Sequence, residues 1–177
     1  TNSTVVYQFD PSLPEASRNE FLQATEFWQA NTGLRFVPRS NETNFLRVSR
    51  LLPDEGICFS NIGMQRGETL MRLADSCSLS TVTHEVGHAI GLYHEHVRAD
   101  RDSYVSIDVS RAQLDQQSQF NPQISGAAES GPYDFGSLMH YAQFEFGRAG
   151  LPVLFTIPRG ISVREAKPTA GDLQAVS

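Results

Sequence analysis

The spacing of apolar residues predicts a long helix near the start of the chain. Over residues 14–31, Phe21 and Trp28 share one helical face with an alanine between them, at spacings of three and four. Ser12 and Glu15 form an S-x-x-E pair at the start of this segment, which is the pattern of a capping box. We therefore expect an amphipathic helix that packs Phe21 and Trp28 inward.

Shorter apolar runs around this helix are typical of strands. Each run is bounded by Pro, Gly, Asn or Asp, and the runs cover residues 4–9, 34–38, 45–48 and 69–73. The spacing of Val82 and Val86 predicts a second helix over residues 80–91. Gly91 can end that helix in a left-handed turn. These elements indicate an N-terminal lobe over about residues 1–97, in which helices lie on a small sheet.

The second half of the chain is less regular. From residue 99 onward turn residues are frequent, and the strand-like runs at 104–109 and 153–157 are short. A last helix is expected to begin near Thr169. We therefore expect a loop-rich C-terminal lobe over about residues 98–177, within one domain that covers residues 1–177.

Composition narrows the class of protein. The 177 residues are 40% hydrophobic and 19% charged, which is typical of an ordinary globular chain. Lys and Arg number 14 against 20 Asp and Glu, so the net charge is −6. This balance argues against a nucleic-acid partner, since phosphate binding needs a basic face. No apolar run reaches the roughly 18 residues that a membrane span needs, so we expect no membrane span.

The candidate chemistry lies in the second predicted helix, as His84-Glu85-Val86-Gly87-His88. Four residues turn a helix by about 400°, so His84 and His88 can reach one ion. Glu85 projects to the side of that pair, where it can meet a water held by the metal. Gly91 allows the helix to end, and His94 follows it closely enough to approach as a third ligand.

This motif is either a chance occurrence of ordinary histidines or a catalytic zinc site. H-E-x-x-H alone arises by chance about as often as it marks zinc, and a single histidine is usually a surface or core residue. The extension to H-E-x-x-H-x-x-G-x-x-H adds two fixed positions and is the metzincin signature when a Met-turn follows. Three imidazoles with an open position indicate a catalytic metal, because a structural zinc site closes with four protein ligands and usually includes Cys.

The signature extends further along the chain and resembles the astacin family of metzincin zinc endopeptidases. After His94 the chain reads EHVRADRDSYV, residues 137–141 read SLMHY like the family's Met-turn, and residues 34–39 read LRFVPR. The resemblance implies an α+β, metzincin-type, two-lobed catalytic domain. Its N-terminal lobe would hold a twisted mixed sheet and two helices including the zinc helix. Its C-terminal lobe would be loop-rich, with an active-site cleft between the lobes.

The resemblance also implies a role for each matched residue. The ligands of one catalytic Zn2+ would be His84, His88 and His94. Glu85 would be the general base that activates water and later returns the proton to the leaving amine. Tyr141 would be a further zinc ligand that swings away and stabilises the oxyanion, and Met139 would be the apolar floor beneath the metal. On physical grounds alone, Tyr141 and Met139 could equally be ordinary core residues.

The roles of three further residues, two cysteines and a glutamate, can each be interpreted in two ways. Cys58 and Cys77 are the chain's two cysteines, and they match a disulfide of the family, whereas the alternative is two buried free thiols. Glu95 resembles the family's buried carboxylate that receives the freed N-terminus of the mature enzyme. Its alternative is an ordinary solvated glutamate after a helix.

The implied substrate is an extended protein or peptide. Three basic residues follow the Met-turn, where the family builds its S1′ pocket: Arg159, Arg164 and Lys167. One of them is expected to favour an acidic P1′ residue, and the alternative for each is a solvated surface charge. We expect a secreted monomer made as a zymogen with a propeptide. The competing functions are a zinc hydrolase of non-peptide amides or esters and a catalytically silent binding module on the same fold.

Overall fold

The computed structural model describes residues 4–52, 55–123 and 130–176. The chain forms two compact units, one made of Thr1–Leu92 with Leu173–Ser177 and the other of Tyr93–Asp172. The division therefore falls earlier than the expected boundary between residues 97 and 98, and the end of the chain belongs to the first unit. The physical reason is packing, because Leu173 and Val176 contact the first unit's core, whereas the fully buried His96 packs against Phe120 of the second unit.

The first unit is built on a five-stranded mixed sheet. Its strands are β1 (Thr4–Phe9), β2 (Arg35–Pro38), β3 (Phe45–Arg50), β4 (Phe59–Ser60) and β5 (Glu68–Leu73). They lie in the order β2-β1-β3-β5-β4, and all neighbouring pairs are parallel except β4 with β5. The four expected strands are confirmed to within about two residues, as is usual for element ends. Strand β4 was not expected, because two residues are too few to show a period.

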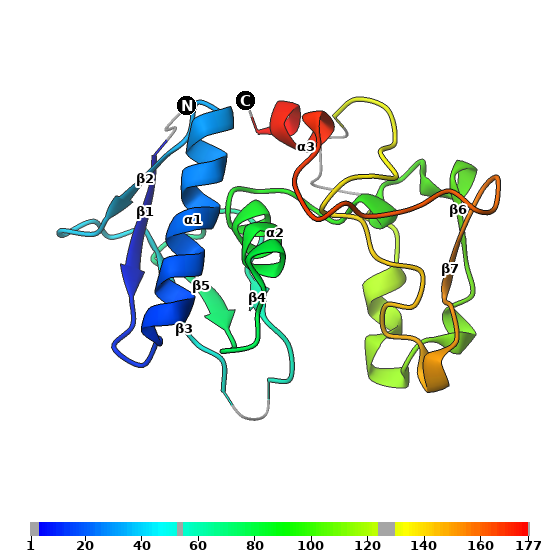
Figure 1. Cartoon of the computed structure of the whole chain (residues 1–177), viewed down its shortest axis with the longest axis horizontal. Helices are drawn as coiled ribbons and strands as arrows, with labels where there is room; N and C mark the ends of the chain where they lie inside the picture. Colours follow the sequence, from blue (N-terminus) through cyan, green and yellow to red (C-terminus); the bar gives the residue numbers. More distant parts are fainter. Residues whose placement is uncertain (1–3, 53–54, 124–129, 177) are drawn as a thin grey trace. The chain divides into compact units, whose positions relative to one another are not determined.

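Two helices, α1 (Glu15–Asn31) and α2 (Leu79–Ala89), lie side by side against the sheet (Figure 1). Phe21 and Trp28 of α1 are fully buried in one core with Val86 of α2 and the inward residues of the strands. The Trp28 indole Nε1 donates a hydrogen bond to the Thr83 carbonyl of α2 at 3.2 Å. This bond satisfies the one polar atom of Trp28 inside the core and links the two helices.

The start of α1 corrects the sequence prediction. Pro14 is the N-cap of α1, and no side chain caps it. The backbone N–H of Ser12 instead donates to Asp10 Oδ1 at 2.9 Å, which places Ser12 in a turn that precedes the helix. The capping box of Ser12 and Glu15 was therefore wrong, although the helix it was meant to begin is present. Proline suits a helix start because it lacks the N–H that would be left without a partner there.

A disulfide joins Cys58 and Cys77, whose Cα atoms lie 6.6 Å apart. Cys58 directly precedes β4, and Cys77 directly precedes Ser78, the N-cap of α2. The hydroxyl of Ser78 accepts from the Thr81 N–H at 3.3 Å and so satisfies one free donor of the first turn. The bridge therefore ties the start of α2 to the edge of the sheet, and it excludes the alternative of two free thiols.

The second unit is rich in loops, as expected. Its regular elements are short: a two-stranded antiparallel sheet of β6 (Val105–Ile107) and β7 (Leu154–Thr156), and several 3-10 turns. The turns are Glu95–Val97, Arg101–Ser103, Val109–Arg111, Leu114–Phe120 and Arg148–Gly150. The expected last helix is α3 (Ala170–Ala175), which begins in this unit. Within the described part of the chain, no helix has the length and apolar character needed to cross a membrane.

Removing the disulfide is expected to destabilise the chain measurably. The bridge closes a loop with a sequence separation of 19, and releasing such a loop in the unfolded state costs roughly 3 kcal/mol of unfolding free energy. The double substitution Cys58→Ser and Cys77→Ser should lower the urea midpoint accordingly. Reductant should lower the midpoint of the wild-type protein and leave that of the double variant unchanged. Equal midpoints for the two oxidised proteins would contradict the prediction.

Candidate metal centre

Helix α2 places two histidines on one side and its apolar residues on the other. Val82, Val86 and Ala89 are fully buried in the core of the first unit. His84 and His88, each 5% exposed, lie one helical turn apart with ring centroids 4.7 Å from each other and planes at 90°. The same periodicity that anchors α2 therefore directs both imidazoles to one point.

The end of α2 is a tight backbone reversal at Gly91. Gly91 has φ of +109°, a conformation that residues with a Cβ rarely adopt. Its N–H donates to the His88 carbonyl at 2.9 Å, and the Leu92 N–H donates to the Gly87 carbonyl at 3.0 Å. These bonds satisfy carbonyls that the helix end would otherwise leave free. The chain then leaves in the direction of His94.

The same turn fixes the orientation of the second histidine. The Leu92 carbonyl lies 2.8 Å from His88 Nδ1, and because a carbonyl can only accept, Nδ1 must carry the proton. Nε2 of His88 is then the atom with a lone pair for a metal, as in most histidine metal sites. Burial lowers the pKa of His88 to about 4, so the ring is neutral near pH 7 in the absence of a metal.

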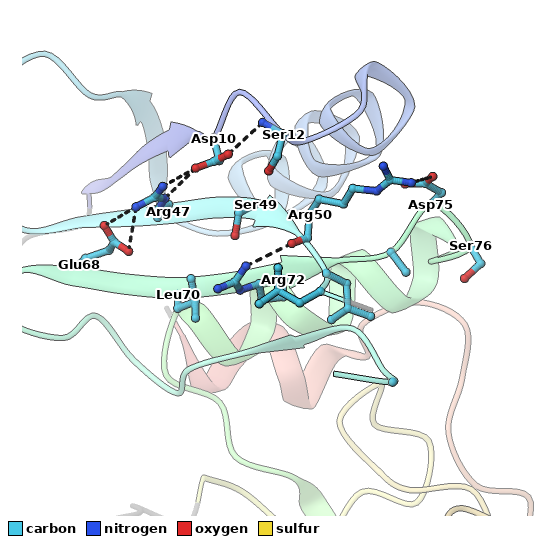
Figure 2. A pocket seen from close by; sticks show the side chains of 14 residues that line it. Asp10, Ser12, Arg47, Ser49, Arg50, Glu68, Leu70, Arg72, Asp75 and Ser76 are labelled. Carbon is cyan, nitrogen blue, oxygen red and sulfur yellow. Dashed lines mark hydrogen bonds and ion pairs between the residues drawn. The ribbon is translucent and has the colours of Figure 1, made fainter. Parts of the chain in front are cut away.

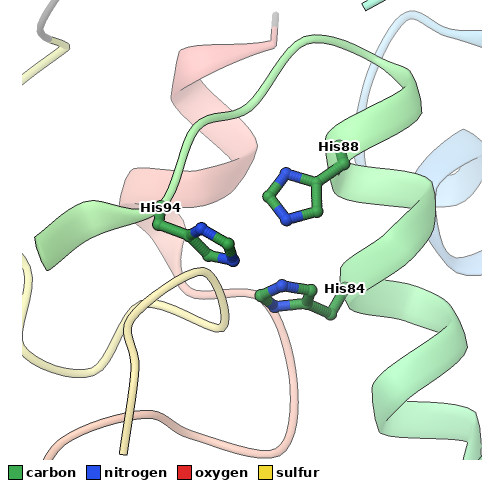
Figure 3. Close-up of side chains that lie close together, drawn as sticks. All are labelled: His84, His88 and His94. Atoms are coloured by element: carbon green, nitrogen blue, oxygen red, sulfur yellow. The ribbon is translucent and has the colours of Figure 1, made fainter. Parts of the chain in front are cut away.

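His84, His88 and His94 converge as the sequence predicts (Figure 3). Each offers a ring nitrogen, and these nitrogens all lie within 4.8 Å of one another. Three nitrogens bound to one tetrahedral zinc ion at about 2.0–2.1 Å are separated by roughly 3.3 Å, so small adjustments of the rings would complete the site. The three imidazoles thus fit one Zn2+ ion and leave a coordination position for another ligand.

The general base expected from the sequence lies beside the first ligand. Glu85 follows His84 on α2 and is 6% exposed. A rotation of about 100° separates neighbouring residues on a helix, so Glu85 lies to the side of the histidine pair. Its position agrees with the proposed role, and the role itself remains a prediction.

Tyr141 and Met139 are both in the second unit, with His94. The ring of Tyr141 packs on the ring of His94 with centroids 4.4 Å apart and stacks on His96 at 3.9 Å with an interplanar angle of 24°. Met139 is 1% exposed, and its carbonyl accepts from the Glu95 N–H at 3.0 Å. The structure therefore brings the Met-turn next to the third histidine, while the role of Met139 beneath the metal and metal ligation by Tyr141 remain proposals.

Two further histidines contact Tyr141, one through its ring and the other through its backbone carbonyl. His96 is fully buried beneath the Tyr141 ring, its Nε2 lies 3.1 Å from the Gln119 carbonyl, and burial lowers its pKa to about 3. His140 is also fully buried, and its Nδ1 donates to the Tyr141 carbonyl at 2.7 Å. Its Nε2 then accepts from the Tyr133 hydroxyl at 2.7 Å. Sequence reasoning missed Tyr133, because it lies in an irregular segment with no periodic signal.

Glu95 lies in a buried carboxylate cluster of the second unit. Only 16% of its side chain is exposed. Its Oε1 accepts a hydrogen bond from the Asp134 N–H at 2.8 Å and lies 3.4 Å from Arg98 Nη1. Burial raises the pKa of Glu95 to about 7, with a smaller contribution from the charges of Asp134 and Asp172. The alternative of a solvated glutamate is therefore wrong.

The three basic candidates for the S1′ pocket differ in their surroundings. Arg164 is half-buried and pairs with Glu145 at 3.3 Å. Arg159 is exposed, and its guanidinium lies over the ring of Phe155 at 4.5 Å from the centroid. Lys167 is exposed and has no ion pair within the described residues. Arg159 is therefore a cation that an aromatic ring holds in place and that no carboxylate neutralises in the described ranges.

A groove of about 810 Å3 lies on the sheet face opposite α1 and α2 (Figure 2). Its charged lining is paired, since Arg47 contacts Asp10 and Glu68, and Arg50 lies 2.6 Å from Asp75. The bonds from Arg47 hold the pKa of Asp10 well below its usual range. None of the metal-binding histidines is among the described residues that line this groove, so it is separate from the metal centre.

The fold and the three imidazoles define a metzincin-type domain with a site for one zinc ion. A family model described as Astacin, a family of peptidases, matches residues 1–176. The chain belongs to the astacin family.

Its relatives are consistent with this assignment. Nematocyst expressed protein 6 of Nematostella vectensis is 32% identical over 96% of this chain and 61% of its own length. Zinc metalloproteinase nas-13 of Caenorhabditis elegans is 32% identical over 90% of this chain and 35% of its own length. The chain thus spans less than two thirds of these curated relatives.

A solved structure shares the fold. High choriolytic enzyme 1 of the medaka fish Oryzias latipes, described as a hatching enzyme zinc-protease, superposes with a TM-score of 0.87 at 24% identity. The superposition covers 98% of this chain and 86% of that chain. At this identity the likeness shows the fold alone, and it confirms the expected α+β class.

Proposed function

We propose that residues 1–177 form a single catalytic domain of a zinc-dependent endopeptidase, which hydrolyses peptide bonds of extended protein substrates with metal-activated water. The observation that carries this proposal is the convergence of His84, His88 and His94 within 4.8 Å, with Glu85 next to the first of them. Three imidazoles leave an open metal position, which catalysis requires. Membership of the astacin family supports the same chemistry.

The residues of the chain divide the work of hydrolysis. A zinc ion held by the imidazoles would acidify its water and polarise the substrate carbonyl. The Glu85 carboxylate would take a proton from the attacking water and later deliver it to the leaving amine. The Tyr141 hydroxyl would donate a hydrogen bond to the oxygen on which negative charge develops, and without substrate it would be a further ligand for the metal. Met139 forms an apolar floor, and no side chain forms a covalent bond to the substrate.

We also propose that the protein is secreted as a monomeric zymogen with a propeptide. The Cys58–Cys77 disulfide supports an oxidising compartment. Glu95 would receive the freed N-terminal ammonium group of the mature enzyme. Its carboxyl lies in a buried cluster with Asp134 and Asp172, where Arg98 is the cation in contact, so a further positive charge would be favourable there.

Specificity is proposed to come from Arg159. Its guanidinium is held over Phe155, whereas that of Arg164 is paired with Glu145. An unneutralised cation in the S1′ pocket attracts an Asp or Glu just after the scissile bond, because the pair gains Coulomb energy as the substrate excludes water. Arg164 and Lys167 would then contribute less.

Replacing Glu85 is expected to separate metal binding from catalysis. Glu85→Ala should cleave casein at least about 100-fold more slowly, because general acid–base catalysis is lost, and should still bind one zinc by metal analysis. Glu26→Ala, an exposed change on α1, is the matched control.

A chelator should abolish wild-type cleavage. Cleavage by Glu85→Ala at the wild-type rate would refute the mechanism. A wild-type protein that hydrolyses small esters but not casein, or nothing at all, would refute the peptidase assignment.

Removing the Tyr141 hydroxyl is expected to lower turnover without loss of the metal. Tyr141→Phe should retain zinc and reduce kcat about 100-fold, since one oxyanion donor disappears while the aromatic packing on His94 remains. Tyr104→Phe removes a hydroxyl from another stacked tyrosine and should leave kcat unchanged. Unchanged turnover in Tyr141→Phe would remove Tyr141 from the mechanism.

Cleavage-site profiling tests the role of Arg159. In a peptide library, the wild-type protein should enrich Asp and Glu at P1′. Arg159→Gln should lose most of that enrichment, and Arg164→Gln should lose less, because its guanidinium is already paired. Arg35→Gln on β2 is the surface control. A wild-type profile without acidic enrichment at P1′ would end this proposal.

A further inference from the structure

Asp172 is a buried carboxylate to which the proposed chemistry gives no role. It lies in α3, is 6% exposed, and has no ion pair within the described residues. Its Oδ1 accepts from the Ser137 hydroxyl at 2.6 Å, and its Oδ2 accepts from the Leu138 N–H at 2.9 Å and from the Thr169 N–H at 2.9 Å. A buried carboxyl group needs such hydrogen bonds to replace its hydration, so these donors are fixed firmly to Asp172.

Ser137 links Asp172 to the backbone of the Met-turn. Its hydroxyl donates to Asp172 and accepts from the Met139 N–H at 3.0 Å. The Met139 carbonyl in turn accepts from the Glu95 N–H at 3.0 Å. Glu95 directly follows His94 in the sequence, so this backbone bond fixes the chain next to the third metal-binding histidine.

A second route joins the same groups. Glu95 Oε1 accepts from the Asp134 N–H at 2.8 Å, and Asp134 Oδ2 accepts from the Thr169 hydroxyl at 2.6 Å. Thr169 also donates its N–H to Asp172. The hydrogen bonds therefore close into a ring that begins and ends at Asp172. A closed ring restrains its members more than a single contact does, because no link can shift without stretching another.

We propose that Asp172 is a positioning residue of the metal centre, which acts through the Ser137 hydroxyl and the Met139 backbone to hold His94 in the geometry that binds zinc. This proposal rests on the proposed function in that the metal is taken to be zinc. Asp172 touches neither the metal nor the substrate. Groups that hydrogen-bond directly to a metal ligand typically change metal affinity 10- to 100-fold when they are removed, and because Asp172 acts through intervening residues we expect an effect near the lower end of that range.

Two substitutions break the ring at different points. Ser137→Ala removes the hydroxyl that links Asp172 to the Met139 N–H. Asp172→Asn keeps the side-chain volume but places an NH2 group where an oxygen accepts, so it loses part of the contact with Leu138, Thr169 or Ser137. Ser49→Ala is the matched control, because Ser49 is 4% exposed and its hydroxyl contacts the Met71 carbonyl in the sheet of the first unit.

The readouts are zinc affinity, by competition with a chromophoric chelator, and the visible absorption spectrum of the Co2+-loaded protein, which reports ligand geometry. We expect Ser137→Ala and Asp172→Asn to weaken zinc binding about 10-fold or more and to shift the Co2+ spectrum, with Ser49→Ala within about twofold of wild type. These assays contain no substrate. Failure of the wild-type protein to cleave peptides would therefore refute the proposed function and leave the comparison of zinc affinities intact.

Three outcomes would overturn the proposal. The first is wild-type zinc affinity and an unchanged Co2+ spectrum in both ring variants. The second is an equal loss of affinity in Ser49→Ala, which would indicate general destabilisation. The third is loss of the folded state in both ring variants, by circular dichroism, because Asp172 would then support the whole domain and not the position of His94. If Ser137→Ala alone fails to fold, Asp172→Asn decides between the remaining results.

Discussion

The geometry of the metal centre depends on the reversal of the backbone at Gly91. Had α2 continued, His94 would lie about 15 Å along the helix axis from His84, too far to share an ion. At φ of +109° the chain turns back, and the three imidazoles converge to within 4.8 Å. The same turn presents the Leu92 carbonyl to His88 and so selects its proton-bearing nitrogen. One backbone conformation thus sets the direction of one ligand and the protonation of another.

Sequence reasoning succeeded where a regular period or a fixed spacing carried the information. The spacing around Phe21, Trp28 and Val86 located both helices of the first unit, since burial of one face leaves a repeating pattern. The spacing of His84, His88 and His94 located the metal site, because helix geometry and a glycine fix where such residues point. The Cys58–Cys77 bridge could also be predicted, because the chain has two cysteines and a single disulfide between them was the one possible pairing.

The remaining features depend on contacts between distant segments, which leave no local pattern. The ring through Asp134, Asp172 and Ser137 joins the loop before the Met-turn to the start of α3, and its hydrogen bonds span 35 positions of the sequence, so no local spacing predicts them. The capping box failed for a different reason. Ser12 had two competing hydrogen-bond arrangements, and the turn at Asp10 prevailed over the helix cap. Local signals of this kind indicate that a helix begins nearby, but its first residue depends on the neighbouring turn.

The division of the chain also bears on how it folds. The first unit is discontinuous in sequence, since Leu173 and Val176 join a core whose other members end at Leu92. During synthesis that core would remain incomplete until the entire second unit had emerged from the ribosome. During synthesis the contacts of Leu173 and Val176 can therefore form only after the second unit has been made, and chains truncated before Leu173 would leave the apolar surface that these residues cover exposed.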